Sequence, residues 1–295
     1  MATVAFIGLG NMGGGMAANL AKAGHEVRAF DLSADALERA RDAGCTPCAD
    51  AASAVAGADA IVTMLPAGRH VEQTYRDSVF GVASPGALLI DCSTIDVDTA
   101  KRVAIAAEAQ GLVAVDAPVS GGIAAAAAST LTFMVGGNDE GFRRAGAFLS
   151  SMGKAVIHAG ASGAGQAAKV CNNMILGATM AVTCEAFALA EKLGLDAQAF
   201  YDIASVSSGQ SWSITSYCPV RGVGPVTPAD REYQGGFAAA LMLKDLRLAK
   251  EAAASAHADI PVGARAAEIY EAFVASNDGA LDFSAIIRPL LERNG

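Results

Sequence analysis

Lys169 and Asn173 are polar residues in a long apolar stretch of the chain, and they are four positions apart. On a helix, this spacing places both side chains on one face. Burial lowers the pKa of a lysine, so a buried lysine is suited to exchange a proton with an alcohol, and a neighbouring amide can hold the alcohol oxygen. The alternative is a lysine that lies along an apolar surface with its ammonium in solvent. The first interpretation predicts a proton-transfer site.

A second group of residues has the spacing of a dinucleotide-binding turn, Gly8-Leu9-Gly10-Asn11-Met12-Gly13. In such a turn the first glycine makes the tight bend, the second lets the backbone approach a pyrophosphate, and the third allows close packing of helix on strand. The N-terminus of the following helix favours the phosphates. A plain glycine turn is the alternative, but the flanking strand and helix patterns favour the nucleotide interpretation.

Asp31 follows the second expected strand, where a dinucleotide fold places the group that meets the adenosine ribose. A carboxylate there accepts hydrogen bonds from the ribose hydroxyls and repels a 2′-phosphate. We therefore expect NAD rather than NADP, unless Asp31 only caps the next turn.

A third glycine-containing segment runs from Asp116 to Gly122 at the end of another expected strand. Gly121 and Gly122 would let backbone N–H groups face a carboxylate, and Ser120 adds a hydroxyl donor. An ordinary glycine turn is the alternative. We expect no metal ion in the site.

Cys45 and Cys48 have the spacing of a redox motif, but they follow a helix rather than open one. Without a helix N-terminus to lower the thiol pKa, this pair does not favour redox chemistry. The six cysteines are expected to be reduced.

The elements that must position these residues alternate in the first half of the chain between short apolar runs and alanine-rich helical segments. This alternation predicts a parallel sheet covered by helices on both faces. The expected strands are Val4–Ile7, Glu26–Phe30, Ala60–Met64, Ala87–Asp91 and Leu112–Asp116, with Leu131–Val135 and Ala155–His158 added later.

The second half is expected to be mostly helical. A long buried helix is predicted over residues 165–193 and closed by Gly194, with further helices over 237–256 and 262–275. Residues 207–236 are rich in Ser, Gly and Pro, which indicates a long loop with a role such as a lid. We therefore predict an α/β fold with an N-terminal Rossmann-like domain (residues 1–162) and an all-α C-terminal domain (163–295), joined by the long helix.

The net charge of -9 and the scattered basic residues do not favour binding to nucleic acid. No apolar run is expected to be long enough to cross a membrane, and a strand pattern that starts almost at Met1 leaves no room for a signal sequence. A cytoplasmic protein with a small-molecule partner is expected.

Together, the glycine turn, the Asp116–Gly122 segment and the Lys169/Asn173 helix resemble the β-hydroxyacid dehydrogenase family, in order and spacing, over almost the whole chain. The likeness is strongest to members that act on 3-hydroxyisobutyrate, and it extends to the following segments: Met64-Leu65-Pro66, Asp91-Cys92-Ser93-Thr94-Ile95, Trp212, Gly235-Gly236-Phe237, Leu243-Lys244-Asp245 and Asp282-Phe283-Ser284. The resemblance implies NAD-dependent oxidation of this acid to methylmalonate semialdehyde in valine catabolism, by a homodimer or homotetramer.

The resemblance also implies roles for individual residues. Lys169 would be the general base or acid, assisted by Asn173. Cofactor contacts would come from the glycine turn and Asp31, and from Leu65, Pro66, Thr94 and Lys244. Substrate contacts would come from Ser120, Gly121, Gly122, Asn173, Trp212, Phe237 and Asp245.

Two positions depart from the family pattern. Gly15 replaces a common proline, which should only loosen a helix start. Ser129 replaces a glycine, and could distort the start of a strand if that position needs a positive φ.

Three other functions remain open. A semialdehyde reductase of the same family would use NADPH, but Asp31-Leu32-Ser33 lacks the arginine of its phosphate site. A dehydrogenase for serine or another β-hydroxy amino acid is not excluded. A non-catalytic NAD-sensing Rossmann dimer is disfavoured by the presence of Lys169.

Overall fold

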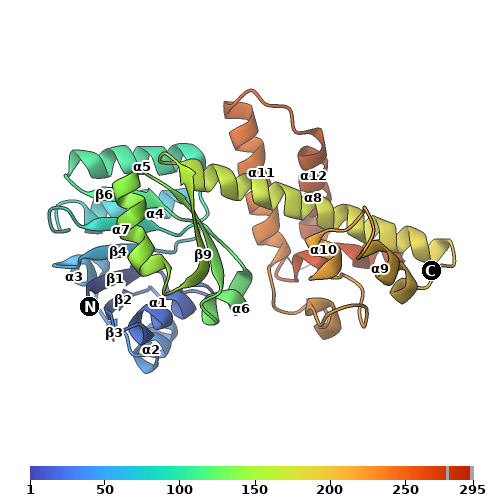
Figure 1. The fold of residues 1–295 in the computed structure, drawn as a ribbon, viewed down its shortest axis with the longest axis horizontal. Helices are drawn as coiled ribbons and strands as arrows, with labels where there is room; N and C mark the ends of the chain where they lie inside the picture. Colours follow the sequence, from blue (N-terminus) through green and yellow to red (C-terminus); the bar gives the residue numbers. More distant parts are fainter. Residues whose placement is uncertain (277–278, 293–295) are drawn as a thin grey trace. The chain divides into compact units, whose positions relative to one another are not determined.

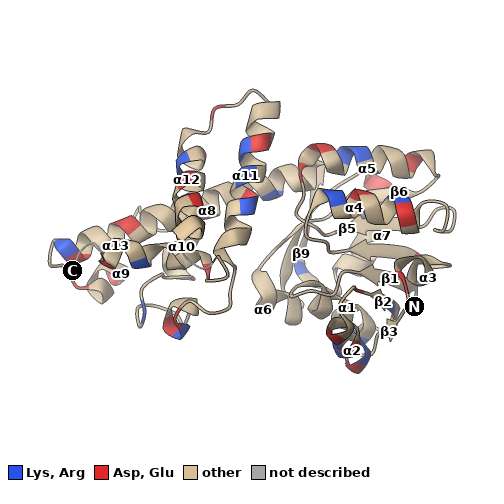
Figure 2. Cartoon of the chain, turned by 180° about the vertical axis from the view of Figure 1, so that it is seen from behind, with Lys and Arg blue, Asp and Glu red and all other residues tan. Residues whose placement is uncertain are grey.

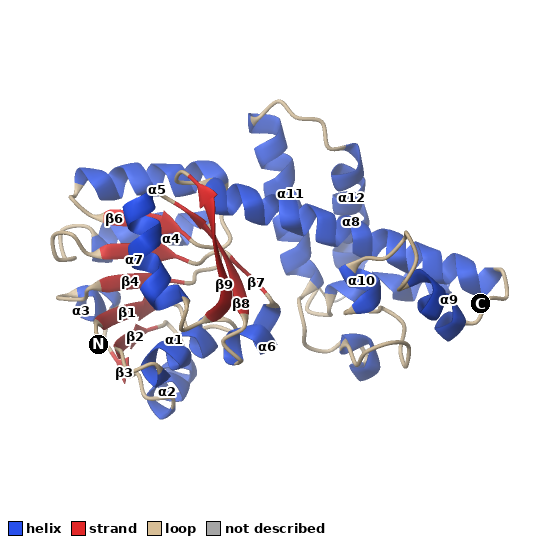
Figure 3. Ribbon diagram, viewed as in Figure 1, coloured by secondary structure: helices blue, strands red, loops and turns tan. Residues whose placement is uncertain are grey.

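The computed structural model describes residues 1–276 and 279–292. Its contacts divide the chain into two compact units, Met1–Lys169 and Val170–Gly295. Strands form the core of the first unit, whereas the second is built from helices (Figures 1 and 3). The α/β fold with an all-α second part is confirmed.

The first unit contains the strands and helices expected from the alternating pattern. Its strands are β1 (Thr3–Ile7), β2 (Glu26–Phe30), β3 (Thr46–Pro47), β4 (Ala60–Thr63), β5 (Leu88–Asp91), β6 (Val113–Asp116), β7 (Val119–Ser120), β8 (Leu131–Gly136) and β9 (Gly153–Gly160). Its helices are α1 (Gly13–Lys22), α2 (Ala34–Asp42), α3 (Ala51–Val55), α4 (Gly68–Thr74), the π-helix η1 (Tyr75–Val79), α5 (Val97–Ala109), α6 (Gly122–Ala127) and α7 (Asp139–Leu149).

The strands form one sheet in the order β3-β2-β1-β4-β5-β6-β8-β7, and β9 pairs with β8. The six strands from β3 to β6 are parallel. Because β1 lies between β2 and β4, the order reverses there, and the carboxyl ends of β1 and β4 flank the crevice where open α/β sheets bind ligands. The sheet is mainly parallel, as expected, but the later strand β8 runs antiparallel to β6 and β7.

The two faces of the sheet bury alternate residues of each strand. In β1, Val4 and Phe6 pack into one apolar cluster, whereas Ala5 and Ile7 pack into the other. This period of two is the pattern that a sheet covered on both faces requires.

The long helix α8 (Ala164–Lys192) begins in the first unit and contributes most of its length to the second. Its bounds agree closely with the predicted range. The other elements are α9 (Ala197–Ala204), α10 (Trp212–Thr215), η2 (Pro228–Arg231), α11 (Ala239–Ser255), α12 (Pro261–Ser276), η3 (Phe283–Ile287) and α13 (Arg288–Glu292). Pro261 opens α12, where its missing N–H costs nothing.

The expected loop over 207–236 is not entirely irregular, because it contains the short helix α10 and the 3₁₀ turn η2.

The expectation that no apolar run is long enough to cross a membrane is wrong for α8. By length and mean hydropathy, 1.4 over its most apolar part, this helix could cross a membrane. Half of that part is buried within the protein, and a central buried helix satisfies the same criteria. Its length and composition alone therefore do not indicate a membrane span.

Charged residues of both signs are interspersed along α2, α5 and α11 (Figure 2). This distribution differs from the clustered positive charge by which proteins follow a phosphate backbone.

Candidate active site

The glycine turn between β1 and α1 has the geometry that its sequence predicts. Gly8 has a φ of +97°, and a Cβ there would lie 2.3 Å from the Met64 carbonyl oxygen. A Cβ on Gly13 would lie 1.9 Å from the Gly8 carbonyl oxygen, so only glycine fits at either position. By contrast, a Cβ on Gly10 would have no atom within 4 Å. The backbone at Gly10 therefore faces open space, as the approach of a pyrophosphate requires.

Asp31 is tied directly to this turn. Its Oδ2 accepts a hydrogen bond of 2.6 Å from the Leu9 N–H, and its Oδ1 accepts one of 2.8 Å from Ser33. The second bond is the turn cap that was the alternative role for Asp31, and the first places the same carboxylate beside the glycine turn. Both roles are compatible, because an ionised carboxylate has about four acceptor positions.

The loops after β4 and β5 are joined to each other. The Leu65 N–H donates to Ser93 Oγ over 2.8 Å. Pro66 and Thr94 follow these two residues in their loops. The expected cofactor segments Leu65–Pro66 and Thr94 thus lie on neighbouring loops at the carboxyl edge of the sheet.

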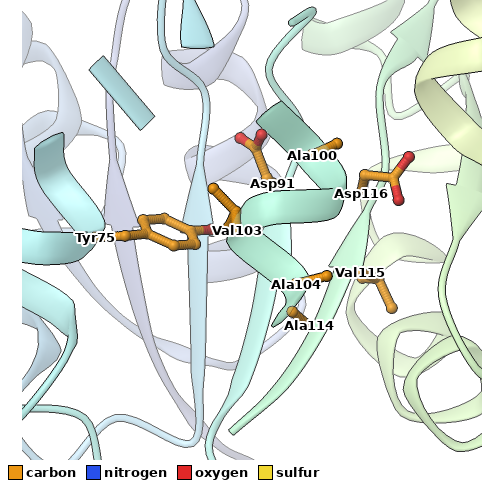
Figure 4. A pocket seen from close by; sticks show the side chains of 8 residues that line it. All are labelled: Tyr75, Asp91, Ala100, Val103, Ala104, Ala114, Val115 and Asp116. Carbon is orange, nitrogen blue, oxygen red and sulfur yellow. The ribbon is translucent and has the colours of Figure 1, made fainter. Parts of the chain in front are cut away.

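Asp91, the last residue of β5, is the centre of a cluster of buried polar residues. Its Oδ1 accepts from Thr63 Oγ1 over 2.8 Å and from the Ser93 N–H over 3.2 Å, whereas Oδ2 is buried with no hydrogen-bond partner among the described residues. The carboxyl group borders a cavity of about 10 Å³, shared with Tyr75 and Asp116 and lined by α5 and β6 (Figure 4). Burial raises the pKa of Asp91 to about 6.

Lys169 is buried, with 8% of its surface exposed, and its Nζ donates a 2.7 Å hydrogen bond to the Val119 carbonyl oxygen. Val119 directly precedes Ser120 in β7. The lysine is therefore not a surface lysine extended into solvent. Its amine is held at the start of the Ser120-Gly121-Gly122 turn.

That turn is open at Gly122 but not at Gly121. Gly121 and Gly122 have φ values of +137° and +74°, and a Cβ on Gly122 would meet no atom within 4 Å, although one on Gly121 would lie 2.6 Å from Ala125 Cβ.

Beyond the turn, Ser129 adopts a φ of +56°. Its hydroxyl donates to the Ser151 carbonyl oxygen over 3.1 Å, and β8 begins at Leu131 with a shift in its register to β9 between Leu131 and Thr132. Gly15 also has a packing role, because a Cβ there would lie 3.1 Å from the α6 backbone at Ala126.

Within the second unit, Asn173, Asp245 and Lys244 are brought together. Asn173 Nδ2 donates to Asp245 Oδ2 over 2.5 Å, and Lys244 Nζ lies 3.3 Å from Asp245 Oδ1. Asn173 Oδ1 accepts from Asn172 over 2.9 Å. Asp245, to which the resemblance assigns a substrate contact, is thus hydrogen-bonded to Asn173.

Trp212 and Phe237 are connected through two other aromatic rings. The Trp212 ring stacks on Tyr217, with centroids 4.8 Å apart, and Tyr217 and Phe237 both contact Phe283. Asp282 holds this group, since its Oδ2 accepts from the Tyr217 hydroxyl and from the Phe237 N–H. Trp212 remains half exposed.

Sequence reasoning did not single out Gln166, Tyr217 or Asp116 as functional residues. Asp116 accepts from the Gly163 and Gln166 N–H groups at the start of α8, and burial raises its pKa. Its position at the end of a strand was the available signal, but a strand end alone does not reveal which distant N–H groups the carboxylate meets. Between Cys45 and Cys48, Thr46–Pro47 forms β3, and burial raises the pKa of the Cys45 thiol to about 11 and that of the Cys48 thiol above its usual range.

This fold and these residues define a nicotinamide-dinucleotide-dependent dehydrogenase with a separate helical domain. Residues 3–160 match the family described as the NAD binding domain of 6-phosphogluconate dehydrogenase, and residues 163–290 match the NAD-binding domain of NADP-dependent 3-hydroxyisobutyrate dehydrogenase. The chain belongs to the 3-hydroxyisobutyrate dehydrogenase family of oxidoreductases.

Relatives and solved structures agree over the full length. A probable 3-hydroxyisobutyrate dehydrogenase of Mycobacterium tuberculosis is 49% identical over 99% of both chains. In Pseudomonas aeruginosa, a 3-hydroxyisobutyrate dehydrogenase is 48% identical and an NAD-dependent L-serine dehydrogenase is 45% identical, each over 97% of both chains. The structure of the M. tuberculosis 3-hydroxyisobutyrate dehydrogenase with L-serine has a TM-score of 0.94 and 49% identity, over 98% of this chain and 99% of the other.

Proposed function

We propose that this protein oxidises the alcohol of 3-hydroxyisobutyrate to methylmalonate semialdehyde with NAD, as a step of valine breakdown. The observation that carries the proposal is the buried Lys169 amine, hydrogen-bonded to the carbonyl oxygen next to Ser120. A neutral amine can donate to Val119 and still accept a proton through its lone pair. In the reverse direction the ammonium returns that proton.

Asn173 assists by holding the alcohol oxygen. Its Nδ2 has two hydrogens, and only one is needed for the bond to Asp245. Asp245 fixes the amide orientation, because the carboxylate accepts only from the NH₂ side. Asp245 is thus a positioning residue for Asn173 and for Lys244.

The substrate carboxylate is bound by the Ser120-Gly121-Gly122 turn. The hydroxyl of Ser120 and the open backbone at Gly122 are the groups suited to accept a negatively charged ligand. Trp212 and Phe237 offer apolar surface suited to the substrate methyl group, and the resemblance supports these assignments.

The residues of the first unit fit NAD. Gly10 leaves the space that a pyrophosphate needs, and Asp31 stands beside the turn where a ribose hydroxyl would be bound. Bound NAD supplies the hydride acceptor, and the protein supplies placement and electrostatics. Leu65, Pro66, Thr94 and Lys244 would complete the cofactor contacts. The carboxylate of Asp31 favours NAD over NADP, because a 2′-phosphate would meet a like charge.

The experiment is a steady-state assay of NADH formation with 3-hydroxyisobutyrate, with the aldehyde product identified by trapping it with a hydrazine. The expected result is equal amounts of NADH and trapped methylmalonate semialdehyde. No NADH formation from this acid, with NAD still bound, would refute the substrate assignment.

L-Serine is the second candidate substrate. One relative is named an L-serine dehydrogenase, and one similar structure contains L-serine. Serine carries an ammonium where 3-hydroxyisobutyrate carries a methyl group. The aromatic rings of Trp212 and Phe237, which the resemblance assigns to the substrate, suit the methyl group, and the carboxylate of Asp245 is already engaged by Asn173 and Lys244. This arrangement favours the hydroxy acid.

We also propose that the protein is a cytoplasmic homo-oligomer in which a second copy packs on α8. Ile175, Val182 and Leu189 are more than half exposed and lie seven residues apart, the spacing by which helices pair. Val182→Glu should lower the mass measured by light scattering, whereas Arg143→Glu on α7 should not. An unchanged mass for Val182→Glu would refute this interface.

A further inference from the structure

Gln166 is a fully buried residue of α8, and its amide side chain makes two hydrogen bonds to the loop after β5. Its Nε2 donates to the Ser93 carbonyl oxygen over 2.8 Å, and its Oε1 accepts from the Ile95 N–H over 3.1 Å. The two bonded residues flank Thr94. The amide therefore fixes the backbone on both sides of a residue that the proposed function assigns to the cofactor.

The backbone of Gln166 is anchored as well. Its N–H donates to Asp116 Oδ2 over 2.9 Å, and the Gly163 N–H donates to Asp116 Oδ1 over 2.7 Å. A Cβ on Gly165 would lie 2.6 Å from the Asp116 carbonyl oxygen, so the helix start is pressed against the end of β6. Gln166 thus joins the end of β6, the loop after β5 and the first turn of α8.

Lys169 follows Gln166 by three residues on α8, so both side chains lie on the same side of the helix. Any rotation of this first turn would move the Lys169 amine away from Val119. The same rotation would release the loop that carries Thr94. One side chain therefore couples the placement of the proton-transfer residue to that of the cofactor loop.

We propose that Gln166 is a positioning residue that holds both the Thr94 loop and the Lys169 amine in the positions that catalysis requires. This inference rests on the proposed function of Thr94 and Lys169. Gln166 does not touch the reacting atoms. Its loss misplaces groups that do, and a misplacement of about 1 Å can reduce the rate about a hundredfold.

The test compares Gln166→Met, which preserves length and loses both side-chain hydrogen bonds, with Thr183→Val as a control. Thr183 is also buried on α8, and its hydroxyl donates within the helix, to the Thr179 carbonyl oxygen. For Gln166→Met we expect kcat to fall about tenfold to a hundredfold and KM for NAD to rise, with KM for the hydroxy acid changed less. Thr183→Val should lower Tm with unchanged kinetics. If Gln166→Met also changes only Tm, the positioning role is refuted.

Gln166→Glu keeps the inference testable if the methionine variant does not fold. Its carboxylate can accept from Ile95, but it can donate to Ser93 only when protonated, and the Asp116 carboxylate beside it favours the protonated form. The kcat of this variant relative to wild type should therefore rise as pH is lowered. A ratio independent of pH would contradict the proposal.

Lys169→Ala, measured in parallel, separates the two claims. If Lys169→Ala stays active, the proposed role of Lys169 in proton transfer is refuted. The effect of Gln166→Met on KM for NAD still tests whether the hydrogen bonds of Gln166 on either side of Thr94 position the cofactor loop. If Lys169→Ala is inactive and Gln166→Met is kinetically normal, only the positioning role fails.

Discussion

The Nζ of Lys169 lies 2.7 Å from the carbonyl oxygen of Val119, the residue before Ser120. This hydrogen bond ties the proposed base to the turn that we assign to the substrate carboxylate. An alcohol whose acid group is bound at Ser120 would therefore be presented to an amine with a fixed position. Proximity of this kind can account for a large part of a rate enhancement.

Lys169→Ala should retain the fold and NAD binding and lose the chemistry. One proton-transfer group contributes about 10²–10⁴-fold to the rate. The measurements are kcat/KM for the hydroxy acid, Tm, and NADH binding by fluorescence. Wild-type kcat/KM in this variant would assign the proton transfer to another residue.

Ser120→Ala should raise KM for 3-hydroxyisobutyrate roughly tenfold, because a hydrogen bond to a charged group contributes about 1.5–3 kcal/mol. Ser53→Ala removes a hydroxyl from the cap of α3, and it should lower Tm without changing KM. Gly122→Val should also weaken substrate binding, because its side chain would occupy the open space at position 122 that we assign to the substrate carboxylate. If these two site variants differ from wild type only in Tm, the turn has no role in binding.

Wild type should prefer NAD over NADP by at least about tenfold in kcat/KM, because NADP replaces a hydrogen bond to Asp31 with like-charge repulsion. Asp31→Ser combined with Leu32→Arg should shift this preference toward NADP. Leu32 is 96% exposed, so an arginine there has room to reach a phosphate. Equal or better use of NADP by wild type would favour a reductase instead.

Stability should depend on pH through Asp91. Folding raises the pKa of this carboxyl group to about 6, so the folded state binds its proton more tightly than the unfolded state does. The free energy of unfolding should therefore fall as pH rises from about 4 to about 6, and the cost, roughly 3 kcal/mol at most, is fully present above that range.

Asp91→Asn should remove this part of the pH dependence. The amide oxygen can still accept from Thr63 and Ser93, and the NH₂ group takes the place of the unpartnered Oδ2. The exposed Asp77→Asn is the matched control, measured by urea unfolding at several pH values. The account of Asp91 fails if both variants retain the wild-type slope.

Local sequence patterns predicted most of the fold. The strands β1, β2 and β8 and the helix α8 agree within about two residues, because apolar runs, glycines and helix periodicity are local signals. The two-residue strand β7 was missed, and β3 was expected only as a loop or a short strand, since both depend on pairing with Phe133 or Ala29 rather than on their own composition. The antiparallel direction of β8 is likewise a property of the tertiary fold.

The proposed site was only partly predictable. Gly8, Gly10 and Asp31 could be assigned from spacing, because the dinucleotide turn is a continuous segment. Gln166 bonds to residues more than seventy positions away, and Asn173 bonds to Asp245 at a similar separation. Such partners are brought together by the fold, and no spacing in the sequence indicates them.

The central claim is the identity of the substrate, and the most direct measurement is kcat/KM for 3-hydroxyisobutyrate and for L-serine, each with saturating NAD, on the same preparation. We predict that the hydroxy acid is preferred by at least about tenfold, since serine must lose the hydration of its ammonium on binding, whereas the methyl group of the hydroxy acid has no such cost. A kcat/KM for L-serine equal to or above that for 3-hydroxyisobutyrate would contradict the proposed function.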